Sequence, residues 1–580
     1  MTFMWKRAAQ LSVLMCTVLA YATPAEAQFE QIRANIKRKL VELGIPSLAV
    51  AVAKDRQIIW EAGFGWADRE KRIPATEHTM YSLASISKPI TATGLMILVE
   101  RGLIDLDRPI GDYLGKAKLH GRAFDASAAT VRLVANHTSG LPLHYQFFYE
   151  DEPYRRPAMD ETIRRYANLV TAPGERYQYS NLGFGIIDYV IERISGKSYP
   201  DFMREEVFLP LGLTRTSVHI GEGLEKFTAT RYAADGTAIP FYDFDHPGGS
   251  AVFSSAHDLV RFGMFHLKNH LSDQRSIITD AAIDEMATAS VNTGERSGYG
   301  IGWSDVRNEK GLRMVRHGGG MGGVSTTLIL LPEENAAIVV LGNASSSAPG
   351  EIANQILAAL VPDKVDPPSE EPSGHEVQLS AAERSKYLGT YDLGEMQFRV
   401  FEGNRGLMIE SAEGNSPLTY QGNDTFIVAL APSMRLTFEL RGTASAIIVN
   451  SGDTTTRGVR LPPGPAFTPM PELAGVWTGE VVTYESTLPV VVAVQESGAV
   501  HIQLGAQPWT LLNDARFSDG FLRGFFAGDI GTEDVNRRPY NLRLEVKQRG
   551  DVLNGSLIGI SLPDNRIGNA LTHWIELRRM

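Results

Sequence analysis

The sequence predicts an α+β domain followed by two small all-β domains. Three observations support this: helical and strand-like patterns mix within residues 28–362, an acidic proline-rich stretch follows, and only strand-like patterns come after it. The chain has 580 residues, and a length of about 100–200 residues per domain allows about three to five domains. We therefore expect several separate hydrophobic cores.

The first domain opens with an amphipathic helix, because apolar residues recur at helical spacing between residues 29 and 43. Residues 47–52 and 58–64 have the apolar texture of two strands joined by a short turn. Near the end of the domain, 327–331 and 337–341 predict a hairpin. Helices combined with short antiparallel strands are typical of an α+β or mixed-sheet domain.

The C-terminal part has the strand patterns of antiparallel domains, either barrel-like or sandwich-like. Residues 542–547 alternate apolar and charged side chains, as in a half-buried strand. The stretches 388–391 and 474–477, which begin the two halves of this C-terminal part, are weakly similar to each other. We predict a linker at 363–380, a small β domain at 381–462, a proline-rich linker at 463–471 and a second β domain, a lipocalin-like barrel, at 472–580.

Residues 1–27 have the pattern of a secretory signal peptide. Lys6 and Arg7 precede an apolar run at 8–22, and Ala25 and Ala27 form an A-x-A cleavage site. The run is short for a membrane span, although an uncleaved anchor is the alternative. We expect export to a bacterial periplasm. Cleavage would remove Cys16, the only cysteine of the chain, so neither a disulfide framework nor a multi-cysteine metal site is expected.

Composition and missing motifs exclude several function classes. The net charge is −11 and the pI about 5.7, which argues against a nucleic-acid binder with a basic surface. The chain has no G-x-S-x-G nucleophile elbow, no H-E-x-x-H zinc motif and no G-x-x-x-x-G-K phosphate loop. We expect no metal, no cofactor, no nucleic-acid partner and no stable membrane anchor.

Ser85 and Lys88 form an S-x-x-K motif at the predicted start of a helix, which continues through an apolar run to Glu100. A serine there is close to the positive end of the helix dipole, and its own N–H is available to an oxyanion. A lysine three residues later shares the serine's face and can take its proton. The alternative is a helix-capping serine beside an exposed lysine, which the tetrapeptide alone does not exclude.

Two further motifs contain polar residues suited to catalysis. Tyr179 precedes Asn181: a tyrosine near a lysine can transfer the leaving-group proton, and an amide can hold a substrate carbonyl or amide. His317 precedes Gly318, Gly319 and Gly320, which permit a ligand to approach the backbone closely. Taken singly, each motif is also compatible with an ordinary turn.

In this order, the three motifs resemble the serine β-lactamase and penicillin-binding superfamily. The similarity is greatest to its class C β-lactamase-like branch, which includes esterases, D-aminopeptidases and D-alanyl-D-alanine carboxypeptidases. The resemblance covers about residues 30–360 and implies an antiparallel sheet flanked by helices, a helical lobe, and a site between them. Supporting stretches lie at 137–142, 194–199, 210–213, 248–258 and 299–303.

The resemblance implies a role for each matched residue. Ser85 resembles the acylated nucleophile, Lys88 its proton acceptor, and Tyr179 the group that protonates the leaving group and later helps to activate water. Asn181 resembles the contact to the substrate amide. Whether Lys88 or Tyr179 is the base stays open.

His317, Gly318 and Gly319 resemble the strand on the far wall of the cleft, and the N–H groups of Ser85 and Gly320 resemble the oxyanion hole. β-Lactamases usually have a lysine where this chain has His317. A histidine with a pKa near 6.5 is mostly neutral at pH 7 and gives no fixed charge for a substrate carboxylate. Residues 147–156 are expected to shape the substrate pocket.

We therefore expect an exported serine hydrolase that acts on small esters or on D-amino-acid amides and peptides. The alternative is a β-lactamase or a penicillin-binding D-Ala-D-Ala carboxypeptidase, and a further one is a non-catalytic cell-wall binding protein. The partner would be a small-molecule or short-peptide substrate, with cell-wall fragments among the candidates. The sequence leaves open the oligomeric state and whether the C-terminal β domains touch the cleft.

Overall fold

The structure is a computed structural model that describes residues 24–233, 235–365, 379–393, 397–403, 406–411, 414–428, 431–451, 454–461, 471–562 and 566–580. Residues 1–23 of the predicted signal peptide and most of both predicted linkers lie outside these ranges. Among the helices described, none combines the length and the apolar character needed to cross a membrane.

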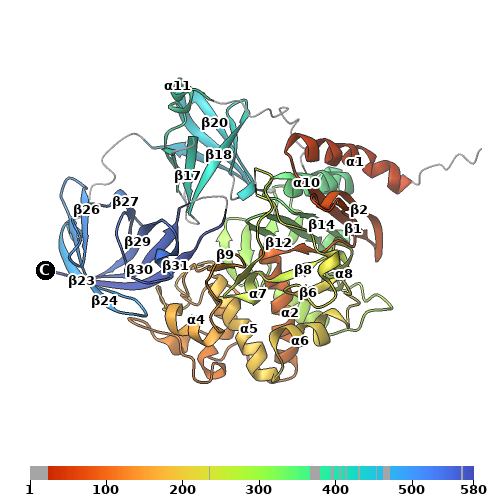
Figure 1. Cartoon of the computed structure of the whole chain (residues 1–580), viewed down its shortest axis with the longest axis horizontal. Helices are drawn as coiled ribbons and strands as arrows, with labels where there is room; N and C mark the ends of the chain where they lie inside the picture. Colours follow the sequence, from red (N-terminus) through yellow and green to blue (C-terminus); the bar gives the residue numbers. More distant parts are fainter. Residues whose placement is uncertain are drawn as a thin grey trace, which may run out of the picture.

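A nine-stranded antiparallel sheet forms the centre of the first domain (Figure 1). Its strand order is β3-β2-β1-β14-β13-β12-β11-β10-β9, so the chain's first and last strands of this domain, β1 and β14, lie side by side. The strands are β1 Ser47–Lys54, β2 Gln57–Asp68, β3 Ile73–Pro74, β9 Val291–Gly294, β10 Ser297–Tyr299, β11 Ser304–Arg307, β12 Arg313–Met321, β13 Val324–Leu331 and β14 Ala336–Gly342.

Helices cover both faces of this sheet. The helices α1 (Pro24–Glu42) and α10 (Ala348–Leu360) pack on one face, and α8 (Ala256–His266) packs on the other. The two faces follow the period of two along β1: Leu48, Val50 and Val52 join the core under α1 and α10, whereas the alanines between them face the larger core. The predicted N-terminal helix and both predicted hairpins are present.

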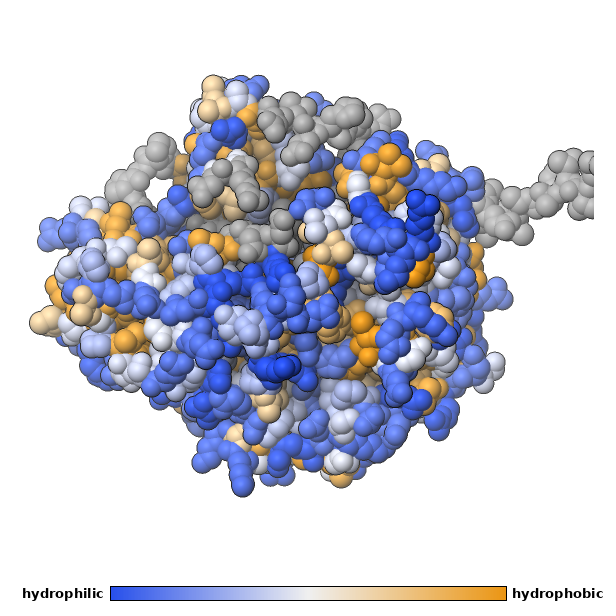
Figure 2. Space-filling model, viewed as in Figure 1, coloured by the Kyte–Doolittle hydropathy of each residue, from blue (hydrophilic) through white to orange (hydrophobic). Residues whose placement is uncertain are grey.

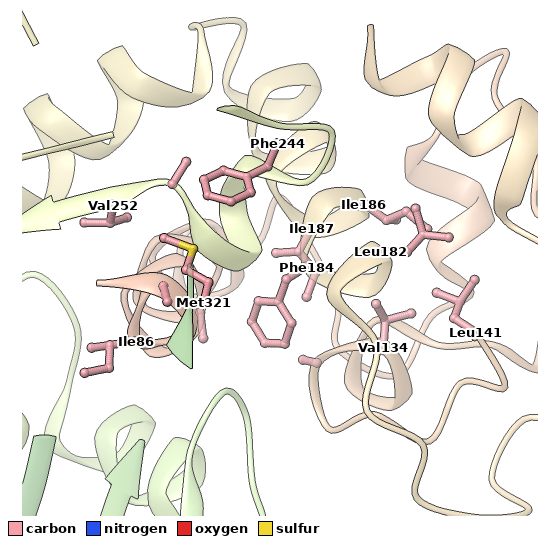
Figure 3. Packing of buried hydrophobic residues seen from close by; sticks show 14 of the residues in the cluster. Ile86, Val134, Leu141, Leu182, Phe184, Ile186, Ile187, Phe244, Val252 and Met321 are labelled. Carbon is pink, nitrogen blue, oxygen red and sulfur yellow. The ribbon is translucent and has the colours of Figure 1, made fainter. Parts of the chain in front are cut away.

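A helical lobe packs beside the sheet. It contains α2 Ser87–Glu100, α3 Val131–Ala135, α4 Met159–Tyr166, α5 Asn181–Ser195, α6 Tyr199–Met203, α7 Pro247–Ser250 and α9 Asp280–Ala287. Short strands complete it: β4 Tyr81–Ser82, β6 Thr216–Val218 and β8 Val252–Ser254 form one sheet, and β5 Phe147–Tyr149 pairs with β7 Tyr242–Phe244. Residues of α5, β8 and β12 share one buried apolar cluster, to which Met321, Phe244 and Ile86 also belong (Figure 3).

Two all-β units follow, as the sequence predicts. After the short helix α11 (Ala381–Arg384), the first unit is a closed eight-stranded barrel made of β15 Gly389–Asp392, β16 Gln397–Gly403, β17 Gly406–Ser411, β18 Gly414–Gly422, β19 Thr425–Val428, β20 Ala431–Arg441, β21 Thr443–Ser451 and β22 Thr454–Arg460. The fold class is therefore confirmed: an α+β domain followed by barrel-like β domains.

The second unit is a nearly closed nine-stranded sheet in the order β26-β25-β24-β23-β31-β30-β29-β28-β27. Its strands are β23 Gly475–Val482, β24 Thr487–Val494, β25 Val500–Leu504, β26 Thr510–Leu511, β27 Asn513–Ser518, β28 Phe521–Phe526, β29 Tyr540–Arg549, β30 Val552–Ser561 and β31 Ala570–Arg579. In the R-G-D triplet at residues 549–551, Arg549 ends β29, and Gly550 and Asp551 form the turn to β30. We call this unit, residues 471–580, the third domain.

The third domain docks on the helical lobe, as Figure 1 shows at α4 and β31. The backbones of Tyr145 and Ala570 exchange two hydrogen bonds, of 3.1 and 2.9 Å. Charged side chains add to this contact: Arg566 binds Asp151 at 2.5 Å, and Arg538 binds Glu152 at 2.5 Å. Hydrophilic residues accordingly predominate on the visible surface where the third domain borders the first (Figure 2).

Candidate active site

Ser85 lies in a 3-10 turn, Ala84–Ile86, that runs directly into α2. It is half-buried, whereas every other residue from Thr79 to Leu98 is buried. Ala84, just before it, has a φ of +47°, a left-handed conformation that costs a non-glycine residue energy. This strained turn leaves Ser85 partly exposed within a segment that is otherwise buried.

Lys88 lies directly below Ser85, as the spacing of three predicts. Its Nζ is 3.1 Å from Ser85 Oγ, 2.7 Å from Asn181 Oδ1 and 3.0 Å from the Gly249 carbonyl oxygen. The side chain is fully buried, and this burial lowers the pKa of Lys88 well below its usual range. The Lys88 amine thus has three oxygen partners within hydrogen-bond distance, one of which is the Ser85 hydroxyl.

The helical lobe supplies the two oxygens that hold Lys88. Asn181 is the first residue of α5, whose N-cap is Ser180: the Ser180 hydroxyl accepts a hydrogen bond from Gly183 N at 3.1 Å. Gly249 lies in α7, the short helix beside α5. Asn181 was predicted to contact the substrate, and in this structure its Oδ1 accepts from Lys88.

Tyr179 lies beside Lys88, with its ring centroid 4.7 Å from Nζ. On its other side it contacts the His137 ring, at 4.3 Å between centroids. His137 also holds the backbone of this segment: its Nδ1 accepts from Ser180 N at 3.1 Å, and its carbonyl accepts from Gln178 N at 2.7 Å. Burial, with Lys88 and His317 nearby, lowers the pKa of His137 well below its usual range, so this ring is neutral.

His317 lies on β12, on the opposite side of the site. Its Nδ1–H donates to the Gly318 carbonyl at 2.7 Å, and its Nε2 therefore accepts from the Tyr299 hydroxyl at 3.0 Å. Burial, and secondarily the nearby Lys88, lower the pKa of His317 to about 3. The side chain is neutral at pH 7 and its two ring nitrogens are occupied within the protein.

Gly319 allows β12 to approach the Ser85 turn. A Cβ at this position would lie 2.0 Å from the Leu83 carbonyl oxygen and 2.4 Å from Thr326 Oγ1. Thr326 Oγ1 donates to the same Leu83 oxygen at 3.0 Å and thus ties the sheet to the turn. Gly320, the next residue on β12, pairs with Ser325 of β13.

The structure brings all seven predicted site residues to one place between the sheet and the helical lobe. Sequence reasoning gave no catalytic weight to Tyr299, Gly249 or His137, although all three lie in stretches that resemble the family's scaffold. No signal in the sequence marked the left-handed backbone of Ala84. Within the described ranges, no group of three or more His, Cys, Asp or Glu side chains is arranged to hold a metal ion.

The third domain reaches the rim of this site. Ile567 lies against the turn after β12, since a Cβ on Gly322 would be 3.2 Å from its Cγ1. The Tyr149 hydroxyl donates to the Ile567 carbonyl at 3.0 Å. Tyr149 belongs to the 147–156 segment that the sequence analysis assigned to the pocket wall.

Comparisons with known proteins agree with the motifs. The family model described as Beta-lactamase matches residues 32–362. Penicillin-binding protein 4* of Bacillus subtilis (strain 168) is 26% identical over 433 residues, which cover 70% of this chain and 92% of that protein.

Two solved structures show the same fold. One is a penicillin-binding protein homologue from Pyrococcus abyssi, described as octameric, with a TM-score of 0.53 and 24% identity, covering 74% of this chain and 99% of that one. The other is a class C β-lactamase mutant, with a TM-score of 0.51 and 18% identity, covering 58% and 99%. The resemblance to the serine β-lactamase and penicillin-binding superfamily is confirmed, and the chain belongs to the β-lactamase family.

Proposed function

We propose that the chain is a serine acyl hydrolase that forms an acyl-enzyme on Ser85. The observation that carries this proposal is the fully buried Lys88, whose Nζ lies 3.1 Å from Ser85 Oγ and whose pKa is held well below its usual range by burial. A structural lysine would have a carboxylate partner or reach solvent, whereas among the described residues Lys88 binds two carbonyl oxygens and the serine. An amine whose pKa is lowered in this way is suited to accept the serine proton.

In the first half-reaction, Ser85 Oγ attacks the substrate carbonyl carbon while its proton moves to the Lys88–Tyr179 pair. The N–H groups of Ser85 and Gly320 stabilise the negative charge on the carbonyl oxygen. Tyr179 then protonates the leaving alcohol or amine, and the carbon–leaving group bond breaks. In the second half-reaction, water gives a proton to the same pair and adds to the acyl carbon. The bond from the acyl carbon to Ser85 Oγ then breaks, the pair returns the proton to Oγ, and the acid leaves.

For the substrate, we propose small esters or D-amino-acid amides and peptides. The neutral His317, with its two nitrogens occupied, offers no fixed positive charge where β-lactamases usually have a lysine. A substrate carboxylate would therefore lack an ion pair from β12. The alternative is a β-lactamase or a D-Ala-D-Ala carboxypeptidase, which the name of the Bacillus relative favours.

We propose further that residues 1–27 direct export to a bacterial periplasm and are removed there. The test is the intact mass of the protein recovered from the periplasm of a bacterial host. A mature chain that begins at Gln28 supports the proposal, and a chain retaining its first residues in the cytoplasm contradicts it.

The nucleophile is tested by intact mass after incubation with a fluorophosphonate and, separately, with a penicillin. Ser85→Ala should abolish the fluorophosphonate adduct. Ser87→Ala is the matched control, because Ser87 is fully buried and its hydroxyl accepts from Val252 N at 3.0 Å. Labelling that persists in Ser85→Ala would refute the mechanism.

The same experiment separates the substrate classes. A lasting penicilloyl adduct would favour the cell-wall carboxypeptidase, and rapid penicillin turnover would favour the β-lactamase. Fluorophosphonate labelling together with hydrolysis of p-nitrophenyl acetate and no reaction with penicillin is the result expected of the esterase or D-peptidase. No adduct from either reagent would indicate a non-catalytic binding protein.

A further inference from the structure

Ion pairs connect the third domain to the start of the segment that carries Tyr179. Glu175 binds Lys547 and Arg549 of β29, and Arg176 binds Glu545 of the same strand. Arg176 lies three residues before Tyr179, and its Nη2 donates to Glu545 Oε1 of β29 at 2.7 Å. The same nitrogen donates to Gln178 Oε1 at 2.9 Å. A carboxylate of the third domain thus fixes two side chains next to the proposed proton-transfer group.

Glu545 is a buried anion among three guanidinium groups. Arg543 Nη2 lies 2.9 Å from its Oε2, and Arg523 Nη2 lies 3.5 Å from its Oε1. The nearby arginines outweigh the effect of burial and hold the pKa of Glu545 well below its usual range. The Arg176 guanidinium also lies 4.4 Å from the centroid of the Phe521 ring, which restricts its position further.

The segment between Arg176 and Asn181 is anchored at every second residue. Arg176 binds the third domain, whereas the backbone N–H groups of Gln178 and Ser180 donate to His137. The intervening Tyr177 and Tyr179 therefore face the aromatic cluster around His137, at 5.8 and 4.3 Å between ring centroids. Only the first of these anchors comes from outside the first domain.

We propose that Glu545 is a positioning residue of the active site, which acts through Arg176 to hold Tyr179 beside Lys88. This inference rests on the proposed function. Gln178 belongs to the same segment as Arg176, so Glu545 is the partner that holds this pair from the third domain, while Glu175 keeps its own ion pairs. Loss of the Glu545 carboxylate therefore frees the Arg176–Gln178 pair and lets the Tyr179 ring shift relative to Lys88. A misplacement of about 1 Å in a catalytic group lowers the rate about 100-fold.

The test uses the full chain with Glu545→Gln, which keeps the shape and removes the charge. We expect the rate of fluorophosphonate labelling and kcat on p-nitrophenyl acetate to fall about 10- to 100-fold, with a smaller change in KM. In a Tyr179→Phe background, the same substitution should lower the labelling rate by less than about twofold, because the two changes affect one step. Arg176→Gln should reproduce both results.

Arg165→Gln is the matched control. Arg165 of α4 also binds the third domain: its Nη1 lies 3.7 Å from Asp534 Oδ2, and its guanidinium lies 4.6 Å from the centroid of the Tyr484 ring. The substitution should leave the labelling rate within about twofold of the wild type, since it loosens docking without touching the Tyr179 segment.

Equal losses from Glu545→Gln with and without the Tyr179→Phe substitution would overturn the proposal, as would an equal loss in Arg165→Gln. If Glu545→Gln does not fold, Arg176→Gln decides, and its unchanged labelling rate would also overturn the proposal. Failure of the proposed function differs from all of these results, because the wild-type chain itself would then give no adduct on Ser85.

Discussion

Gly319 is the position where one added methyl group should disable the site. In the structure, a Cβ there would lie 2.0 Å from the Leu83 carbonyl oxygen, and ordinary contact needs about 3.5 Å. Gly319→Ala must therefore move β12 and the turn before Ser85 apart by about 1.5 Å. Leu83 and Ser85 belong to one short segment, and Gly320 follows Gly319 on the strand, so the shift changes the distance between the two proposed oxyanion donors.

Loss of one oxyanion donor lowers kcat about 100- to 1,000-fold, and we expect a loss of this size in Gly319→Ala. The assay is kcat and KM on p-nitrophenyl acetate, together with the rate of fluorophosphonate labelling. Because the change affects charge that develops only in the transition state, kcat should fall much more than KM rises.

Gly318→Ala is the matched control on the same strand. Its Cβ would meet only the Thr326 carbonyl oxygen, at 3.7 Å, which is ordinary contact. We expect it to keep kcat within about threefold of the wild type, and the melting temperature of both variants should be recorded. A Gly319→Ala enzyme with wild-type kcat, or one that loses no more than Gly318→Ala, would refute the reasoning.

Three further predictions concern charge, pH and strain. His317→Lys should raise the ratio of the rate on nitrocefin to the rate on p-nitrophenyl acetate about tenfold or more, because one charge-assisted hydrogen bond to a carboxylate contributes that much. An unchanged ratio would contradict the role given to this position. His573 is fully buried, and burial lowers its pKa from 6.5 to about 4, so the unfolded chain takes up a proton between these values that the native state does not, and stability falls with falling pH in this window. When the pH is lowered from 7 to 5, the free energy of unfolding of His573→Phe should therefore fall by about 2 kcal/mol less than that of the wild type. Urea unfolding at each pH measures both losses, and equal losses would exclude His573 as the cause. Ala84→Gly should raise the free energy of unfolding by about 1 kcal/mol because it relieves the φ of +47°, and urea unfolding at pH 7 would show no gain if the turn is not strained.

The periodicity of apolar residues was sufficient to predict regular helices and strands. The apolar spacing between residues 29 and 43 predicted α1, and the alternation at residues 542–547 predicted β29, because burial of one face imposes a period on the sequence. The spacing of three between Ser85 and Lys88 likewise predicted their contact, since one helical turn brings those side chains together.

The environment of these residues could not be predicted in the same way. The pKa of Lys88 is lowered because the side chain is buried and is held by residues of α5 and α7, and nothing in the S-x-x-K tetrapeptide specifies that burial. The neutral state of His317 was expected from its ordinary pKa, but the structure gives a stronger reason: burial, with Tyr299 and Gly318 binding its two nitrogens.

The sequence by itself determined the superfamily, the α+β and all-β architecture, and the identity of the residues that meet at the site. These properties follow from the local pattern of apolar and polar residues and from the order of the motifs, both of which can be read from the sequence. Only the tertiary structure decided the protonation states, the strained turn at Ala84, and the contact between Glu545 and Arg176. Those features depend on burial and on contacts between residues hundreds of positions apart in the sequence. The interactions that produce them form only when the chain is folded.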